Sequence, residues 1–309
     1  MNLPLVTIMV PTYGQELFIE KSVRSAMDQD YPNLEIIISD DCSPDNTRRI
    51  CENLALEDER ITYYYNSKNL GRVKNYHETL YHRANGDYVV NLDGDDCFVD
   101  NEFISKGLGC IIGFKEKQKP LVYVACKRLN YIDHQIDVVH DIENNTEVLS
   151  GEDFLSGMYT KYKFSHLTTI YNRDPALKLN FYSKDFISSD TESLVKLISL
   201  SNVIVSKDIV GQWNAVGNNE SLVPDFKKNL NNLNWIESSN SFLKNKINTK
   251  KRIIWKYKSI YFYSKTVLKV LSNGNLNLTN FFRLVRHSYF INILLILPVI
   301  VLNSLLRKI

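Results

Sequence analysis

The sequence contains few cysteines, no paired metal-binding spacing and no glycine-rich phosphate loop. Its five cysteines are scattered over 309 residues without a Cys-x-x-Cys pair, which argues against a disulfide framework and against a zinc ribbon. Neither a Walker-type loop nor a Gly-x-Gly-x-x-Gly fingerprint occurs. The first residues lack a basic stretch before an apolar run, so we expect no signal peptide and reduced thiols in a cytoplasmic protein.

Acidic residues are almost absent from the last quarter of the chain. Residues 1–226 hold 22 Lys and Arg against 34 Asp and Glu, a net charge of −12, whereas residues 227–309 hold 15 Lys and Arg against Glu237 alone, a net charge of +14. This asymmetry predicts two regions with different partners. Nucleic acid or anionic lipid would suit the basic region, where Trp, Tyr and Phe are interleaved with Lys and Arg from residue 255 to 269.

Long hydrophobic runs are also missing. The most apolar segment, Tyr289–Leu306, is interrupted by Asn292, Pro298 and Asn303, and crossing a bilayer takes about 20 predominantly apolar residues. We therefore predict an interfacial or re-entrant anchor on an anionic membrane surface and no nucleic acid partner. A true membrane span and a buried helix or oligomer contact remain the alternatives, and the oligomeric state stays open.

Strand and helix periods alternate along the first hundred residues. Strand-length apolar runs occupy Leu5–Val10, Leu34–Ser39, Ile61–Tyr65 and Tyr88–Leu92, and helical patterns at Glu16–Met27, Asn46–Leu56 and Arg72–Arg83 separate them. Helices between strands predict an α/β fold with a doubly wound, mostly parallel sheet and right-handed crossovers.

The remainder of the chain is divided in two by its composition. Residues 101–226 contain mixed elements: helices at Glu102–Lys117 and Asp190–Leu200, and strands at Leu121–Cys126, Val203–Val205 and Ile209–Trp213. Residues 227–247 and 250–271 carry aromatic residues at loose helical spacing. We predict three regions, 1–100, 101–226 and 227–309, the last being basic, largely helical and membrane-associated.

Three carboxylates stand together directly after the fourth predicted strand. The run Leu92-Asp93-Gly94-Asp95-Asp96 places like charges so close that they raise one another's pKa unless a cation compensates them. A divalent ion with oxygen ligands would do so and could also hold a diphosphate. In open parallel sheets, ligands bind beyond the carboxyl ends of the strands. A solvated acidic turn is the alternative interpretation.

Polar residues follow the other three strands as well. Pro11-Thr12-Tyr13 follows the first strand and Asp40-Asp41 the second, where a carboxylate can accept hydrogen bonds from a base or ribose. Gly71 and Arg72 open the helix after the third strand, and helix N-termini favour anions. Helix capping and a solvated basic face are the plainer alternatives.

These four places together resemble the nucleotide-sugar-binding half of family 2 glycosyltransferases, which have the GT-A fold. The matching stretches are Val10-Pro11-Thr12-Tyr13, Ile38-Ser39-Asp40-Asp41-Cys42-Ser43, Asn69-Leu70-Gly71, and Ala84-Asn85-Gly86-Asp87-Tyr88 leading into Leu92-Asp93-Gly94-Asp95-Asp96. Their order and spacing agree across about residues 5–100. Cys42 stands where glycine is commoner and Gly14 where asparagine is usual; neither change removes a carboxylate.

The resemblance implies transfer of a sugar from a nucleotide-diphosphate donor with inversion at the anomeric carbon. Asp41 would bind the nucleotide base, and Asp93 and Asp95 would be the family's Asp-x-Asp, with Asp95 at a divalent cation, Mn²⁺ or Mg²⁺. The predicted donor site further includes Pro11, Thr12, Tyr13, Arg72 and Gly94.

The resemblance also implies a base near the start of a helix in the second half, because attack by the acceptor hydroxyl requires removal of its proton. Asp190 fits best and Glu192 second, although Ser189-Asp190 replaces the usual Glu-Asp pair. Trp213 and residues 218–221 fall where a loop closes over the diphosphate in such enzymes. A lone histidine is more often structural than a ligand, so we expect a structural role for His166, with contact to an acceptor as the alternative.

The partners implied are a UDP- or other nucleotide-sugar donor and a saccharide or polyprenyl-linked saccharide acceptor, used in surface polysaccharide synthesis at the inner face of the cell membrane. A sugar-nucleotide pyrophosphorylase shares a similar sheet, but the stretch after the first strand lacks the glycine-rich basic loop that it would need. A non-catalytic membrane scaffold with the same fold is the other alternative.

Overall fold

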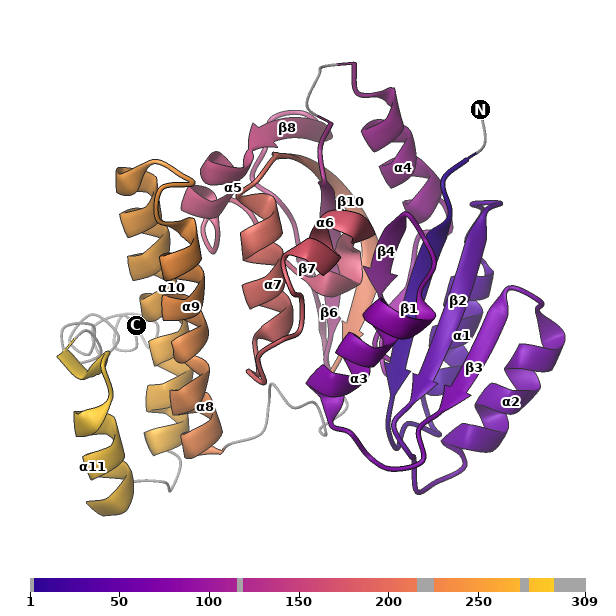
Figure 1. The fold of residues 1–309 in the computed structure, drawn as a ribbon, viewed down its shortest axis with the longest axis horizontal. Helices are drawn as coiled ribbons and strands as arrows, with labels where there is room; N and C mark the ends of the chain where they lie inside the picture. The colour runs from indigo at the N-terminus through magenta and orange to yellow at the C-terminus, as the bar shows by residue number, and fades with distance from the viewer. Residues whose placement is uncertain (1–2, 116–118, 216–224, 273–277, 292–309) are drawn as a thin grey trace.

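The computed structural model describes residues 3–115, 119–215, 225–272 and 278–291. The first half is a parallel sheet in the order β3-β2-β1-β4, formed by β1 (Val6–Thr12), β2 (Leu34–Asp40), β3 (Ile61–Tyr65) and β4 (Tyr88–Asn91). Helices α1 (Ile19–Met27), α2 (Thr47–Glu57) and α3 (Arg72–Glu78) connect these strands (Figure 1). The predicted alternation of strands and helices is confirmed, and apart from the end of α3 the observed ends differ from the predicted ones by at most three residues.

Strand β1 lies at the centre of this half and is buried along its whole length. Ile8 belongs to the hydrophobic cluster that includes Val23 of α1, whereas Met9 belongs to the cluster that includes Tyr76 of α3. Helices therefore cover both faces of β1, and this explains why the strand is a continuous apolar run rather than an alternating one. Helix α3 continues into a π-helical turn at Thr79–Arg83, so the predicted helix is two elements.

The second half makes the sheet mixed, so the expectation of a mostly parallel sheet is wrong beyond β4. Strand β9 (Thr169–Asn172) pairs antiparallel with both β4 and β6 (Val122–Asn130). The two short strands expected near the end of this half are one long strand, β10 (Asn202–Asn214), which runs parallel to β6 with irregular register after Val205. Strands of both halves thus end at the same rim of the sheet.

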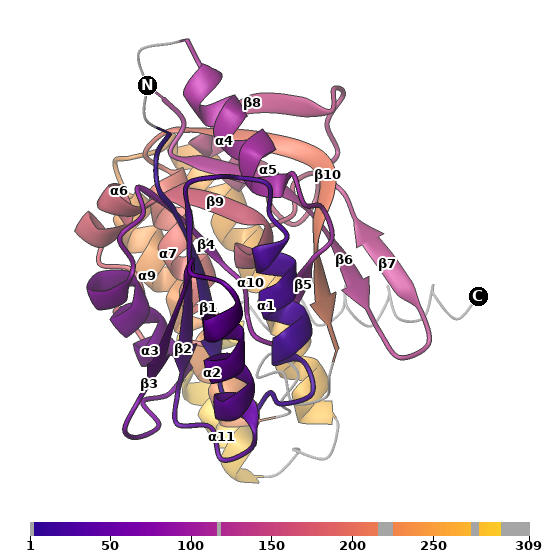
Figure 2. The ribbon, with the colours of Figure 1, turned by 90° about the vertical axis from the view of Figure 1, so that its right-hand side faces the viewer.

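Short strands extend the sheet beyond this core. Strand β5 (Cys97–Phe98) and strand β8 (Thr146–Ser150) pair antiparallel with β10. Strand β7 (Gln135–Val138) pairs antiparallel with β6, and the two form a hairpin that projects from the body (Figure 2). The remaining elements of this half are α4 (Phe103–Gly113), α5 (Gly151–Gly157), α6 (Arg173–Lys178), α7 (Ser189–Ile198) and a 3₁₀ turn at His166–Thr168.

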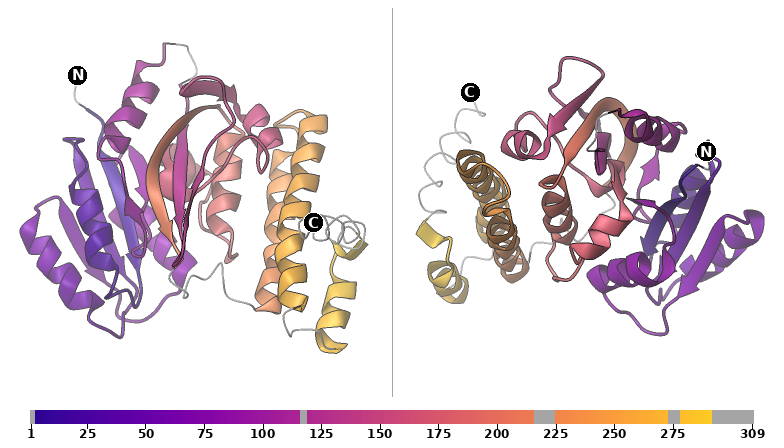
Figure 3. Two further views of the ribbon diagram at one scale, coloured as in Figure 1. Left: turned by 180° about the vertical axis from the view of Figure 1, so that it is seen from behind. Right: turned by 45° about the horizontal axis from the view of Figure 1, so that its top comes forward.

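The described part of the basic region is helical, as expected. It forms α8 (Phe226–Asn232), α9 (Asn234–Leu243), α10 (Thr249–Ser272) and α11 (Leu278–Arg286). Helices α8–α10 stand beside the second half, on the side away from α2 and β3 (Figures 1 and 3). Trp235 of α9 and Trp255 of α10 are fully buried with ring centroids 5.9 Å apart. These helices therefore share the hydrophobic core of the second half rather than standing apart from it.

Two further expectations concern the thiols and the membrane. All five cysteines, each within the described part of the chain, are free thiols. Of the helices in the described ranges, none is both long enough and apolar enough to cross a bilayer. Most of the predicted anchor, from residue 292 to 306, lies outside the described residues.

Candidate active site

A cavity of about 880 Å³ opens at the carboxyl ends of β1 and β4. The first half lines it with Pro11, Thr12, Tyr13, Gln15, Asp41, Asn69, Gly71, Arg72, Asn75, Tyr76, Asp93 and Asp95. The second half and the C-terminal helices line the rest, among them Lys127, His166, Asp190, Trp213, Lys228, Phe262 and Tyr263. The strand ends of a parallel sheet meet at one rim, so the polar residues that follow them face a common space.

The three carboxylates after β4 form one cluster. Ligand oxygens of Asp93, Asp95 and Asp96 lie within 4.8 Å of one another. Burial and the charge of Asp93 raise the pKa of Asp95 to about 7. Burial and both neighbouring acids also raise the pKa of Asp96 well above its usual range, although that carboxylate accepts a hydrogen bond from the Asn214 amide at 3.0 Å. An all-oxygen donor set with several carboxylates fits a hard divalent cation.

Gly94 shapes this cluster without facing the cavity. A Cβ atom at Gly94 would collide with the side chains of Gln15 and Thr12. Only glycine therefore allows the acidic turn to pack beneath the end of β1. The predicted contact between Gly94 and a donor is not visible in this arrangement, since Gly94 is buried and does not line the cavity.

A chain of polar contacts crosses the cavity from the acidic cluster to α7. Asp93 accepts a hydrogen bond from the Tyr76 hydroxyl at 2.5 Å through Oδ1, and its Oδ2 lies 3.2 Å from His166 Nε2. On the other side of the ring, His166 Nδ1 lies 3.3 Å from Asp190 Oδ2. That second contact is close enough for an ion pair but is not aligned as a hydrogen bond.

The carboxylates of Asp93 and Asp190 favour the protonated form of His166, which lies between them. Burial by itself would lower the pKa of His166, but Asp93 and Asp190 outweigh it and raise that pKa to about 10. Burial would likewise raise the pKa of Asp190, yet the contact with His166 and the charge of Arg72 bring it down to about 2. At neutral pH the three groups are therefore an imidazolium between two carboxylates.

Helix α7 lines this space with Asp190 and Thr191. Every residue of α7 is buried except Asp190, whose side chain is 19% exposed. Asp190 lies in the first turn, where the helix dipole favours a carboxylate. Glu192, the second choice for a base, is buried and pairs with Lys196 at 2.5 Å, and it also accepts a hydrogen bond from Ser238 of α9. Glu192 thus faces away from the cavity.

Asp41 and Arg72 line the cavity while holding parts of the chain in place. The Asp41 carboxylate accepts hydrogen bonds from the backbone amides of Leu70 and Gly71, both at 2.8 Å. Gly71 has φ of 87°, a left-handed conformation that favours glycine. The Arg72 guanidinium donates to the carbonyls of Phe186 and Ile187 at 3.1 and 2.7 Å. These contacts fix the loop before α3 and the approach to α7.

The structure brings the predicted residues together, with one exception. Pro11, Thr12, Tyr13, Asp41, Arg72, Asp93, Asp95 and Asp190 all line the same cavity, and Gly94 lies beneath it. Trp213 also lines it, whereas residues 218–221 of the predicted closing loop lie outside the described residues.

The sequence did not predict several cavity residues that come from the second half and the C-terminal helices. The structural role expected for His166 does not describe its position, because the ring faces the cavity between two acids. Lys127 of β6 also faces the cavity and donates to the Ser165 hydroxyl at 3.3 Å, and burial lowers its pKa. Neither residue belongs to a short motif: His166 opens the 3₁₀ turn before β9, and Lys127 lies within β6.

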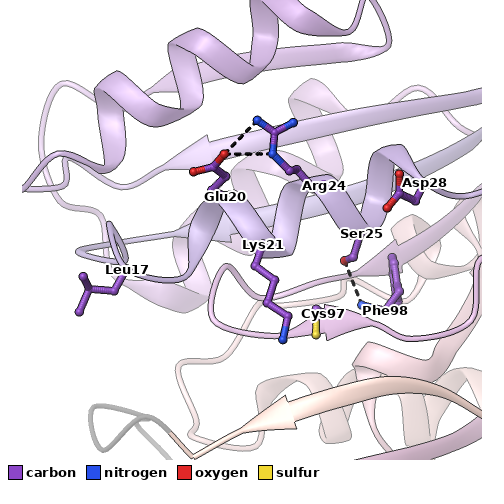
Figure 4. Close-up of a pocket in the computed structure, with 8 residues that line it drawn as sticks. All are labelled: Leu17, Glu20, Lys21, Arg24, Ser25, Asp28, Cys97 and Phe98. Atoms are coloured by element: carbon purple, nitrogen blue, oxygen red, sulfur yellow. Dashed lines mark hydrogen bonds and ion pairs between the residues drawn. The ribbon is translucent and has the colours of Figure 1, made fainter.

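A second hollow of about 510 Å³ lies between α1 and β5 (Figure 4). Two pairs of its lining residues contact each other: Arg24 pairs with Glu20 at 2.9 Å, and the Ser25 hydroxyl accepts a hydrogen bond from the Phe98 amide at 3.0 Å. The hollow lacks a cluster of acids like that of the larger cavity. We therefore assign the candidate site to the larger cavity.

Comparison with known proteins agrees with this geometry. Residues 7–111, about a third of the chain, match the model of glycosyl transferase family 2. The putative teichuronic acid biosynthesis glycosyltransferase TuaG of Bacillus subtilis is 43% identical over 93 residues, covering 30% of this chain and 36% of the relative. A Campylobacter jejuni protein named GalNAc(5)-diNAcBac-PP-undecaprenol beta-1,3-glucosyltransferase is 35% identical over 94 residues, covering 30% of each chain. The matches thus span about a third of these curated relatives.

Solved structures resemble the chain over a greater length. S. aureus TarS in complex with UDP-GlcNAc aligns with a TM-score of 0.60 at 16% identity, covering 85% of this chain and 81% of that one. Mannosyltransferase PcManGT from Pyrobaculum calidifontis, in complex with GDP-Man and Mn²⁺, aligns with a TM-score of 0.60 at 16% identity, covering 91% and 79%. At this identity the likeness concerns the fold.

Fold and site together define an α/β protein of the GT-A type, with an acidic cluster at the rim of a mixed sheet. Residues 7–111 match glycosyl transferase family 2, so this part of the chain is similar to members of that family.

Proposed function

We propose that the protein is an inverting glycosyltransferase that moves a sugar from a nucleotide-diphosphate donor to a saccharide acceptor. One observation supports this most strongly: the acidic cluster and the Asp190 carboxylate line a single cavity and are linked through His166. Inverting transfer needs two such groups, one region that holds the diphosphate and a separate base for the acceptor hydroxyl.

The donor would occupy the side of the cavity formed by the first half. Tyr13 is 51% exposed at the end of β1, where its ring can stack on a nucleotide base, with Pro11 and Thr12 beside it. Asp41 would accept hydrogen bonds from the base, and Arg72 would add positive charge near the phosphates. The two similar structures were solved with UDP-GlcNAc and with GDP-Man, which supports a nucleotide-diphosphate sugar as donor here.

Asp95 would be the principal ligand of a divalent cation, Mn²⁺ or Mg²⁺, with Asp93 and Asp96 beside it. When bound, such an ion supplies Lewis-acid stabilisation of the charge that develops on the departing nucleotide diphosphate. Burial and the neighbouring charge of Asp93 raise the pKa of Asp95, which supports this assignment because a bound cation would stabilise the ionised carboxylate. The similar mannosyltransferase was solved with Mn²⁺, which is consistent with this assignment.

Asp190 would take the proton from the acceptor hydroxyl as that oxygen attacks the anomeric carbon. The new bond forms on the face opposite the departing diphosphate, which inverts the configuration. As the one residue of α7 that is not buried, Asp190 is the acid that this helix offers to an acceptor. Its low pKa keeps the carboxylate ionised at neutral pH, and it also makes Asp190 a weak base.

The acceptor would enter from the second half and the C-terminal helices, where Phe262 and Tyr263 of α10 and Lys228 of α8 line the cavity. We propose a growing saccharide, carried on a polyprenyl lipid, as acceptor in surface polysaccharide synthesis. The name of the Campylobacter jejuni relative, which includes a PP-undecaprenol saccharide, supports this class. In this proposal residues 1–100 hold the donor and residues 101–226 the acceptor.

A basic helical region would hold the protein at the inner face of the cell membrane as a peripheral or monotopic enzyme. On α10, Tyr257 is 60% exposed and Ile253 is 46% exposed, and Lys250 and Lys265 are exposed on the same helix. Apolar and aromatic side chains mixed with lysine are typical of helices that lie on anionic lipid.

A thermal-shift screen of nucleotide sugars, with and without Mn²⁺, tests the proposal, since a matched donor stabilises the fold by mass action. We expect one donor to raise the unfolding temperature only when Mn²⁺ is present, and that donor then to be consumed in a transfer or hydrolysis assay. Absence of any stabilising donor, together with absence of donor turnover, would overturn the proposed function.

A further inference from the structure

His166 contacts a carboxylate on each side of its ring. Nε2 lies 3.2 Å from Asp93 and Nδ1 lies 3.3 Å from Asp190. The two nitrogens of an imidazole ring point in different directions, so each can face its own polar partner. The ring thus joins an acid of the first half to an acid of the second.

The surrounding residues hold the ring in this place. His166 packs edge-on against Tyr76, with ring centroids 6.0 Å apart and planes at 87°, and Tyr76 itself donates to Asp93. The 3₁₀ turn that carries His166 is attached to its neighbours: Thr168 donates to the Ala125 carbonyl at 3.0 Å, and Thr169 donates to the Ser165 carbonyl at 2.6 Å. The ring has little freedom to leave either acid.

We propose that His166 is a positioning residue that fixes the Asp190 carboxylate relative to Asp93, and so sets the base at a defined place relative to the bound donor. This inference rests on the proposed function. It differs from a structural role because it concerns the alignment of two groups across the cavity, and misplacing a reacting group by about 1 Å can lower a rate by about 10²-fold.

Loss of the positioning contact should affect turnover rather than donor binding. In His166→Gln the amide can donate to one carboxylate only, and Asp190 loses its fixed partner. We expect kcat to fall by about 10²-fold while the donor KM changes by less than about threefold. This is the pattern for an interaction that stabilises only the transition state. His166→Asn, whose shorter side chain reaches less far, should lose at least as much activity.

His140→Gln is the matched control. His140 is also a buried histidine, but it does not line the cavity and accepts a hydrogen bond from the Lys163 amide at 3.1 Å. We expect this variant to keep the kcat of the unaltered protein. Equal losses of kcat in His140→Gln and His166→Gln, or an unchanged kcat in His166→Gln, would overturn the positioning role.

A double-mutant cycle on unfolding temperature tests the contact without any donor. We expect Asp190→Asn to lower the unfolding temperature of the unaltered protein. In the His166→Gln background the same substitution should lower it by at least about 3 °C less, because the effects of two coupled groups are not additive. Strictly additive shifts would overturn the inference. If the cycle shows coupling but no donor is turned over, the contact stands and the proposed function fails, so the two outcomes are distinguishable.

Discussion

The guanidinium of Arg72 donates a hydrogen bond to the backbone carbonyl of Ile187 at 2.7 Å. Arg72 opens α3 in the first half of the fold, and Ile187 lies three residues before Asp190 in the second half. The contact therefore joins the loop that would hold a nucleotide to the chain segment that positions the proposed base.

This contact predicts that Arg72→Met loses stability as well as activity. Hydrogen bonds from a charged donor contribute about 1.5–3 kcal/mol each, and Arg72 donates one to the Ile187 carbonyl and one to the Phe186 carbonyl, which also accepts from the Ser189 amide. We expect the free energy of unfolding to fall by about 2 kcal/mol in urea denaturation. Lys74→Met, at an exposed position of the same helix, is the control. Unchanged stability with weaker donor binding would mean that Arg72 acts only on the donor.

Asp95→Ala should abolish transfer without unfolding the protein. Removing one of three crowded acids relieves repulsion, so we expect the unfolding temperature to stay the same or rise. Loss of the proposed cation ligand should lower kcat/KM by about 10³-fold, because metal assistance is worth several kcal/mol. The measurements are initial rates with the matched donor and a thermal melt. Full activity of this variant, or full activity in excess chelator, would count against a metal-dependent reaction.

The affinity for Mn²⁺ should depend on pH with a midpoint near 7. Because the pKa of Asp95 is raised to about 7, the carboxyl holds a proton below that pH, and the ion must displace it to bind. Affinity should therefore fall by up to about tenfold per pH unit below 7 and level off above it. Calorimetric titration between pH 5.5 and 8 measures this. In Asp95→Asn the dependence should be lost; a flat profile in the unaltered protein would show that Asp95 does not bind the ion.

Asp190→Asn should slow turnover far more than it weakens donor binding. General base catalysis contributes about 10²–10⁴-fold, so we expect kcat to fall within that range while the donor dissociation constant stays within about threefold. Asp185→Asn, an exposed acid just before α7, serves as the control and should behave like the unaltered protein. An unchanged kcat in Asp190→Asn would remove Asp190 from the role of base.

Replacing exposed lysines of α10 should weaken binding to anionic membranes. Lys250, Lys265 and Lys269 are exposed, and each basic residue near an anionic leaflet contributes about 1 kcal/mol. We expect Lys→Glu at these three positions to lower co-sedimentation with phosphatidylglycerol vesicles by at least about 10²-fold in partition coefficient. Binding to neutral vesicles is the control. Equal binding of the variant and the unaltered protein to anionic vesicles would place the membrane contact outside α10.

The sequence by itself determined the first half of the fold and the acidic side of the site. Continuous apolar runs separated by helical patterns predict parallel strands covered on both faces, and the residues after such strands share one rim. That local logic placed Asp41, Asp93 and Asp95 around a common cavity, as the structure has them. The prediction succeeds because each strand–helix unit of a parallel sheet repeats the same local geometry.

The second half of the site depends on tertiary structure alone. The position of His166 follows from the antiparallel pairing of β9 with β4 and β6, which joins residues more than 40 positions apart. Helices α8 and α10 line the cavity in a region whose core contains Trp235 of α9 packed on Trp255 of α10, whereas the net charge of this region pointed to a membrane. The periodicity of a sequence shows which face of an element is buried but not which distant element covers it, so only the folded chain shows which distant side chains meet.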